Sequence, residues 1–240
     1  AVAHQLGVVD VQGDLGNRTN NASGTLNGIS AELNIDGNTP TSGSDVMTVD
    51  DTVDTADNVG VLTSSTITGL GMTDAINYVA IEHLTISLGS GSDTFTINST
   101  HGAATESSQE DTTLNTGAGE DTVHINDVTD RLYVNAEGDA DTINVNGTGS
   151  GSTTTLNGNA GGDTFNVHAM DGDVYVNGGS GGDTVNVSNL SPDLPPGPRT
   201  TQLGSIDSIN GLLTIDGGFG SDTVNVDDSV AAALNNKFGT

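Results

Sequence analysis

The stretch from Asn177 to Val187, NGGSGGDTVNV, constrains the fold more than any other part of the chain. Its glycine-rich half cannot hold a helix, because each glycine costs about 1 kcal/mol there relative to alanine. The residues after Asp183 alternate between polar and apolar, which is the period of a strand with one buried face. The stretch therefore predicts a glycine-rich turn that leads into a strand, with a carboxylate at the junction.

The same pattern recurs along the chain. Four further clear copies and two weaker ones end at these aspartates: Asp93, Asp121, Asp163 and Asp222, with Asp141 and Asp45 as the weaker two. From Asp93 to Asp183, successive motif aspartates lie 28, 20, 22 and 20 residues apart. Repeats of about 20 residues are typical of a solenoid, in which each repeat forms one coil.

Hydrophobic residues follow each motif aspartate at fixed distances. The second and fourth residues after it are apolar in every copy, as at Val185 and Val187. Because alternate residues of a strand share a face, these positions should form inward columns when coils stack about 4.8 Å apart. The third residue should form an outward asparagine ladder, at Asn144, Asn166, Asn186 and Asn225. We therefore predict an all-β fold, a right-handed parallel β-solenoid of about nine coils of roughly 20 residues.

The whole chain, residues 1–240, is expected to be one continuous solenoid. The segment 28–37 matches 208–217, so the chain holds one long unit of about 180 residues and the start of the next. The segment 66–86 has no aspartate motif but keeps strand alternation, and we expect a calcium-free coil there. Four of the five prolines lie in 188–212, which predicts a loop extruded from one side.

The amino-acid composition limits the kinds of partner that the chain can bind. The net charge is −28, and the only fixed positive charges are Arg18, Arg131, Arg199 and Lys237. Such a chain repels nucleic acid and anionic membranes and attracts cations. It has no cysteine and no apolar run approaching the roughly 20 residues of a membrane span. Low hydrophobicity with high charge is also typical of disorder. The regular spacing of aspartates and valines argues instead for a folded, calcium-loaded chain.

The motif has the chemistry of a calcium site. Glycines can point several backbone carbonyls at one spot, because they adopt positive φ without steric cost. Stacking two such turns brings two aspartates and several carbonyls around one centre. Six to eight oxygen ligands suit Ca²⁺, and the motif has no nitrogen or sulfur ligand for zinc or copper. We predict several calcium ions between successive coils.

The segments GGSGGDTVN and GGFGSDTVN resemble the repeats-in-toxin (haemolysin-type) calcium repeat, G-G-x-G-x-D-x-U-x, nearly residue for residue. In that family the turns bind calcium between coils of a parallel β-roll. Here a variable loop replaces every second copy of the nonapeptide, so we expect calcium along one edge only. The turns before Asp141 and Asp45 lack glycines of the pattern, with Glu137 in one and Pro40 and Thr41 in the other. The resemblance implies carboxylate ligation by Asp93, Asp121, Asp163, Asp183 and Asp222, more weakly by Asp141 and Asp45, and backbone ligation near Gly89, Gly91, Gly117, Gly119, Gly161, Gly179, Gly181, Gly218 and Gly220.

The longer unit resembles units of giant tandem-repeat bacterial surface proteins. We therefore expect a secreted, non-enzymatic structural protein that forms a rigid extracellular rod or a filament of copies joined end to end. The alternative is the stalk of a calcium-dependent adhesin that binds a partner or a glycan through its loops. Because Tyr133 and Tyr175 lie within predicted strands rather than loops, the sequence favours the structural role.

Other candidate sites have simpler explanations. The acid pairs Asp50-Asp51 and Asp227-Asp228 are expected to lie at the surface or to cap loops, because nothing nearby supplies an acid, a nucleophile or a pocket. His124 and His168 are expected to be solvated strand residues.

Overall fold

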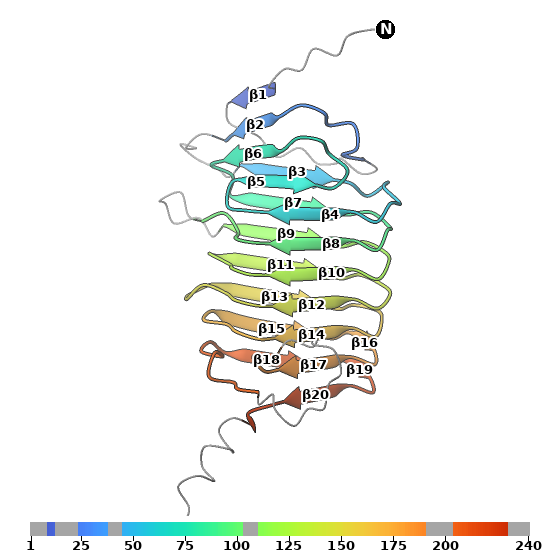
Figure 1. Ribbon diagram of the computed structural model, residues 1–240, viewed down its shortest axis with the longest axis vertical. Helices are drawn as coiled ribbons and strands as arrows, with labels where there is room; N and C mark the ends of the chain where they lie inside the picture. Colours follow the sequence, from blue (N-terminus) through green and yellow to red (C-terminus); the bar gives the residue numbers. More distant parts are fainter. Residues whose placement is uncertain (1–8, 13–23, 38–44, 103–109, 191–203, 230–240) are drawn as a thin grey trace, which may run out of the picture.

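A computed structural model describes residues 9–12, 24–37, 45–102, 110–190 and 204–229 of the chain. It is an all-β solenoid with two long sheets and a short two-stranded one at the edge (Figure 1). The smaller long sheet has seven strands, in the spatial order β18 (Leu213–Asp216), β15 (Asp173–Asn177), β13 (Thr153–Asn157), β11 (Arg131–Asn135), β9 (Asp111–Asn115), β7 (His83–Ser87) and β3 (Val46–Asp50).

The larger sheet has 11 strands. Their spatial order is β1 (Val9–Gln12), β2 (Leu33–Asp36), β6 (Ile76–Val79), β5 (Thr66–Gly69), β4 (Val59–Leu62), β8 (Thr94–Ile97), β10 (Thr122–Ile125), β12 (Thr142–Val145), β14 (Thr164–Val167), β17 (Thr184–Val187) and β20 (Thr223–Val226). Each of the seven strands of the smaller sheet continues through a turn into a strand of the larger one, so the described residues contain seven two-strand coils. No helix among the described residues is long and apolar enough to cross a membrane.

The predicted inward columns are confirmed. Phe165 pairs in register with Ile143 on one side and Val185 on the other. Val123 and Phe95 continue the same column, and its members are at most 3% exposed. Parallel, in-register stacking thus gives a thin aliphatic core, because each coil contributes only the inward side chains of two short strands.

The predicted hydrogen-bonded asparagine ladder is also confirmed, although Asn144 and Asn166 in it are buried rather than exposed to solvent. The side-chain amide of Asn166 donates to Oδ1 of Asn144 at 2.9 Å, and those of Asn186 and Asn225 continue the row at 2.9 Å each. His124 takes the next position of this row, with its Nδ1 3.3 Å from the amide nitrogen of Asn144.

His168 likewise belongs to a parallel row, with its Nδ1 2.9 Å from Oδ1 of Asn146. His124 and His168 are both partly exposed, as expected, and each also makes a hydrogen bond to a neighbouring coil. Each occupies an asparagine position, because an imidazole can make the same hydrogen bond between coils.

The segment 66–86 does not form the expected extra coil. β5 pairs antiparallel with β4 and with β6, so the chain reverses twice inside the larger sheet. A hairpin turn closes the first reversal, where the amide of Thr63 donates to the carbonyl of Thr66 at 2.9 Å. In the second, three successive residues have positive φ: Gly69 (81°), Leu70 (52°) and Gly71 (72°). Short turns such as these two join antiparallel strands, whereas neighbouring parallel strands need a longer crossover connection.

The two copies of the long repeat occupy different positions in the solenoid. β2, in segment 28–37, lies in the larger sheet and pairs with β6, whereas β18, in the matching segment 208–217, lies in the smaller sheet and pairs with β15. The strands that follow are exchanged in the same way, since β3 pairs with β7 and β20 with β17. The two matching segments are therefore half a coil out of phase, because the antiparallel strands lie beside only the first of them.

Residues 191–203 of the expected extruded loop lie outside the described residues. Its described ends are joined, because the amide of Asn189 donates to the carbonyl of Ser205 and the amide of Ser205 to Oδ1 of Asn189, both at 2.9 Å. Ile209 then pairs with Met170 of the preceding coil. The described ends of this segment thus lie against each other and against the preceding coil.

Candidate functional site: an aspartate ladder along the turn edge

The glycine-rich turns lie along one edge of the solenoid, the right-hand edge in Figure 1, where β16 (Ser180–Gly181) and β19 (Phe219–Gly220) are labelled. Neighbouring turns pair with each other through the bridges Ala118–Gly138, Gly138–Ala160 and Ala160–Ser180, and β16 pairs with β19. A narrow row of paired backbone therefore holds the turns in register.

Five of the six turns before the motif aspartates from Asp93 to Asp222 share one backbone conformation, whereas the turn of Gly89 and Gly91 before Asp93 lacks its positive φ values. Four residues before the motif aspartate, φ is positive at Gly117 (95°), Gly179 (97°) and Gly218 (82°). Glu137 (68°) and Asn159 (64°) occupy the same position with the same sign of φ. The turn before Asp141 was expected to be the weak one because Glu137 replaces a glycine, yet it keeps the conformation of the other turns.

Close stacking explains a second glycine position, two residues before the aspartate. A Cβ atom at Gly181 would lie 1.4 Å from the carbonyl oxygen of Gly161, and one at Gly220 would lie 1.4 Å from that of Gly181. The turns at Gly181 and Gly220 therefore rest their Cα directly on a carbonyl of the preceding turn, which glycine allows because it has no side chain. Asp139 holds this position in the turn before Asp141, with φ of 76°.

The motif aspartates form what we call the aspartate ladder: Asp93, Asp121, Asp141, Asp163, Asp183 and Asp222. The backbone amide of each donates to Oδ1 of the next, at 2.7, 2.7, 2.9, 2.9 and 3.1 Å in chain order. At the start of the ladder, the amide of Asn58 donates to Oδ1 of Asp93 at 2.7 Å. One carboxylate oxygen per coil thus satisfies the backbone of the coil before it.

The second carboxylate oxygen is different. In the four inner members of the ladder, Oδ2 is buried and has no hydrogen-bond partner: Asp121, Asp141, Asp163 and Asp183, each at most 2% exposed. Within the described part of the chain, no basic side chain pairs with these four groups. Leaving a buried charged oxygen unsatisfied is costly, so a row of four calls for protons or a cation.

The raised pKa values of three ladder aspartates reflect the same cost of burying an unpaired carboxylate. Burial raises the pKa of Asp121 to about 6, that of Asp141 to about 7 and that of Asp163 to about 6. The hydrogen bond from the preceding amide lowers each pKa, but by less than burial raises it. The neighbouring carboxylates of Asp121, Asp163 and Asp139 add to the rise at Asp141. The hydroxyl of Thr116 lowers the pKa of Asp121 as well, although its proton points to the carbonyl of Ala136 at 2.9 Å.

The turns fit an oxygen-ligated cation. A Cβ at Gly158 would lie 2.3 Å from Oδ2 of Asp163, and one at Gly178 would lie 2.4 Å from Oδ2 of Asp183, so the missing side chains make room for these oxygens. The donors offered here are carboxylate and backbone carbonyl oxygens, which suit a hard cation such as Ca²⁺. No group of three or more His, Cys, Asp or Glu side chains suited to hold a metal occurs among the described residues. A cation at the ladder must therefore take most of its ligands from the backbone.

The predicted ligand residues are placed unequally. The ladder brings together six of the seven motif aspartates, and Asp222, in the last described coil, is exposed. Asp45 is not part of it. It precedes β3 of the smaller sheet and lies on the opposite edge, where its amide donates to Oε2 of Glu82 at 2.6 Å. The cause is the half-coil displacement of the first long repeat described above.

Sequence reasoning missed the first member of this edge. Asn58 holds the aspartate position in the coil of β3 and β4, and the turn before it lies against the turn of Asp93. The amide of Ser90 donates to the carbonyl of Asp54 and that of Ser92 to Oδ1 of Asp57, both at 2.9 Å. The available signal was Leu62, four residues after Asn58, in the spacing of the other copies.

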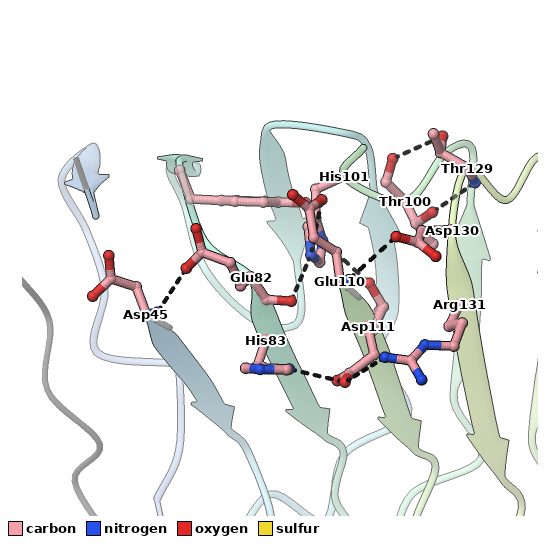
Figure 2. Close-up of polar contacts among 12 residues, drawn as sticks. Asp45, Glu82, His83, Thr100, His101, Glu110, Asp111, Thr129, Asp130 and Arg131 are labelled. Atoms are coloured by element: carbon pink, nitrogen blue, oxygen red, sulfur yellow. Dashed lines mark hydrogen bonds and ion pairs between the residues drawn. The ribbon is translucent and has the colours of Figure 1, made fainter. Parts of the chain in front are cut away.

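The opposite edge carries a second row of acids, shown in Figure 2: Asp45, Glu82, Glu110 and Asp130, each just before a strand of the smaller sheet. Unlike the ladder, this row has basic neighbours. Nε2 of His101 lies 3.3 Å from the carbonyl of Glu82 and 4.0 Å from Oε2 of Glu110.

A carboxylate beside this row is paired as well. Oδ2 of Asp111 lies 2.8 Å from Nδ1 of His83 and 3.9 Å from Nη2 of Arg131. Sequence reasoning did not connect these residues, because they come from three coils.

The acid pair Asp50-Asp51 caps a loop, as predicted. Oδ2 of Asp50 accepts the amide of Gly24 at 3.0 Å, and Oδ1 of Asp51 accepts the amide of Leu26 at 2.8 Å. The corresponding Asp227 accepts the amide of Ser229 at 3.0 Å. These hydrogen bonds account for the carboxylates without a catalytic role.

The chain matches no protein-family model, and comparisons with curated proteins and with solved structures give no significant match. The resemblance to the calcium repeat therefore rests on the motif residues alone, and the solenoid fold on the pairing of the strands.

Proposed function

We propose that this chain is a calcium-stabilised structural rod of an extracellular protein. The observation that carries the proposal is the row of four buried Oδ2 atoms without partners, at Asp121, Asp141, Asp163 and Asp183. A purely structural glycine turn has no use for a repeated, buried and unpaired carboxylate oxygen, because a serine or asparagine would fill the space without the cost of a charge.

Calcium would remove that cost. The inner ladder aspartates would supply carboxylate oxygen, and the turn residues around Gly117, Gly119, Gly179 and Gly181 would supply carbonyl oxygen. A bound ion would neutralise neighbouring carboxylates and join one coil to the next. Extracellular calcium modules bind their ion at about 10⁻⁴ to 10⁻³ M, which is why the proposal places the protein outside the cell. No catalytic role is proposed.

The last described coil supports association end to end. Val224 and Val226 of β20 are 52% and 61% exposed, whereas Val185 and Val187 at the same positions of β17 are 3% and 5% exposed. Phe219, in the turn between β18 and β20, is 84% exposed. A coil with the same spacing would bury these side chains and continue the sheets. We propose that another copy of the chain, or the next unit of a longer one, supplies it, so that the rod grows head to tail.

Circular dichroism during calcium titration tests this function. In chelator at pH 7.5 the strand signal should be largely lost, and it should return cooperatively as calcium is added. Asp163→Asn should shift the calcium midpoint to higher concentration, because it removes a ligand charge. Asp74→Asn, at an exposed aspartate outside the ladder, is the matched control and should leave the midpoint in place. A strand signal that survives chelation in the unmodified chain would refute the proposal.

A further inference from the structure

The outward face of the smaller sheet carries an aligned pair of tyrosines. Tyr133 of β11 pairs in register with Thr155 of β13, which pairs in register with Tyr175 of β15. All three side chains are partly or well exposed, with Tyr175 at 38%, while the residues on either side of each in its strand are buried in the core. The tyrosines therefore face solvent, two coils apart, rather than fill the interior.

The spacing of the pair is fixed by the fold. Neighbouring strands lie about 4.8 Å apart, so the two tyrosines lie about 10 Å apart along the axis of the stack. The same column is otherwise small, with Thr85, Thr113 and Thr214 in the flanking coils. The face is thus a strip with two aromatic rings two coils apart. Figure 1 shows the strands β11, β13 and β15 that carry it.

Polar columns run along both sides of the strip. On one side lie Asn135, Asn157 and Asn177, where the amide of Asn157 donates to Oδ1 of Asn135 at 2.9 Å and so fixes its orientation. On the other side lie Arg131, Thr153 and Asp173. Amide, hydroxyl and charged groups that flank aromatic rings offer hydrogen bonds around a ligand that stacks on the rings.

We propose that this face binds an extended neutral polysaccharide of β-1,4-linked hexoses, laid along the axis of the solenoid. One face of a pyranose ring consists of C–H groups and stacks on an aromatic ring. In an extended β-1,4 chain each ring is turned over relative to the last, so every second ring presents the same face.

The length of one hexose in such a chain is close to the distance between two adjacent strands of the sheet. Two successive rings of like orientation therefore meet Tyr133 and Tyr175, and Thr155 lies beneath the ring between them. The net charge of −28 excludes an acidic polysaccharide, because the solenoid would repel it.

The position of the site differs from the sequence-based expectation. Tyrosines within strands favoured a structural role, on the assumption that a glycan would bind the loops. The register shows that Tyr133 and Tyr175 lie on the outward face, in one column. The site is built from regular strands, which hold ligand-stacking side chains more rigidly than loops do. It is separate from the aspartate ladder, and its failure would leave the calcium proposal standing.

The first test is depletion of the full chain, in excess calcium, by insoluble polysaccharides. The chain should bind microcrystalline cellulose or chitin, which are both β-1,4-linked, and should bind neither granular starch, whose α-linked chain coils, nor polygalacturonate, which is acidic. Binding to neither cellulose nor chitin would overturn the inference.

The second test changes only the spacing of the rings. The double variant T155Y/Y175T keeps the composition and both tyrosines but brings them onto adjacent strands. It should bind about tenfold more weakly, as should Tyr175→Ala, whereas Tyr175→Phe should bind like the unmodified chain because stacking does not need the hydroxyl. Melting in calcium checks that each variant folds. Unchanged binding by a folded T155Y/Y175T would contradict the proposal.

Discussion

The backbone amide of Asp141 donates a hydrogen bond of 2.9 Å to Oδ1 of Asp163 in the next coil, while Oδ2 of Asp163 is buried without a partner. One carboxylate thus does two things: one oxygen holds the coils together and the other carries an uncompensated charge. The hydrogen bond through Oδ1 keeps successive coils in register. The unpaired charge on Oδ2 makes the stability of the fold depend on a proton or a cation that neutralises the aspartate ladder.

Without calcium, stability should fall as pH rises. The pKa values of Asp121, Asp141 and Asp163 are raised to about 6, 7 and 6, above the ordinary 3.8 of an unfolded aspartate. The folded chain therefore binds more protons between these values, and its stability is highest below pH about 4 and is lost through pH 6 to 7. Ionisation of Asp163 alone should lower the free energy of unfolding by about 3 kcal/mol. Denaturant midpoints in chelator, from pH 4.5 up to the pH at which the strand signal is lost, measure how stability changes with pH, and millimolar calcium should flatten this dependence. A midpoint that rises with pH in chelator would contradict the ladder.

Asp141→Asn should uncouple folding from the cation. The amide oxygen can still accept the hydrogen bond from Asp121, now 2.7 Å, and no charge remains to be neutralised. The metal-free variant should be more stable than the unmodified chain at pH 7.5 by about 1 to 3 kcal/mol, and its response to calcium should be weaker. Circular dichroism at pH 7.5, in chelator and in calcium, provides the comparison, because the variant should keep strand signal in chelator where the unmodified chain has largely lost it. Lower metal-free stability of the variant would show that Asp141 is not buried as a charge.

Gly181→Ala should be among the most damaging single changes. The new Cβ would lie 1.4 Å from the carbonyl oxygen of Gly161, against rigid backbone, and φ at this position is +144°. The expected loss is more than about 3 kcal/mol of unfolding free energy. Gly28→Ala is the matched control, because a Cβ there meets nothing within 4 Å. Thermal melting in calcium compares the two, and equal losses would mean that the turns do not stack this closely.

The asparagine ladder should contribute most to stability at its middle residue, Asn166. Asn166 is 1% exposed and is bonded to Asn144 and Asn186. Asn166→Ala breaks both bonds and leaves the buried amide of Asn144 and the partly buried amide of Asn186 each without a partner, at a cost of about 2 to 4 kcal/mol. Asn225→Ala, at the exposed end of the same row, breaks one bond and should cost less than about 1 kcal/mol. Similar losses in chemical denaturation would show that the row is not a cooperative element.

Sequence periodicity predicted the regular part of this fold and most of the candidate site. From Asp93 onward the spacing of aspartates and alternate apolar residues determined which side chains point inward, and Phe165, Ile143 and Val185 lie in the predicted column. The ladder could be predicted for the same reason: identical positions of stacked coils must be neighbours.

The N-terminal part could not be predicted in this way. Strand alternation looks the same for parallel and antiparallel neighbours, so the reversal through β5 left no trace in the pattern between Thr66 and Val79. Its consequence is that Asp45, despite its motif, lies beside Glu82 on the far edge. The geometry at Glu137 and Asp139 was likewise hidden, because pairing with neighbouring turns imposes positive φ values of 68° and 76° on residues that do not favour them.

The most direct test of the central claim is a crystal structure of the chain grown with calcium, with the ions identified by anomalous scattering. The account predicts calcium peaks between successive turns, in contact with Oδ2 of Asp121, Asp141, Asp163 and Asp183 and with carbonyl oxygens of the glycine-rich turns. A folded solenoid in which these four oxygens contact only water or protein at saturating calcium would contradict it.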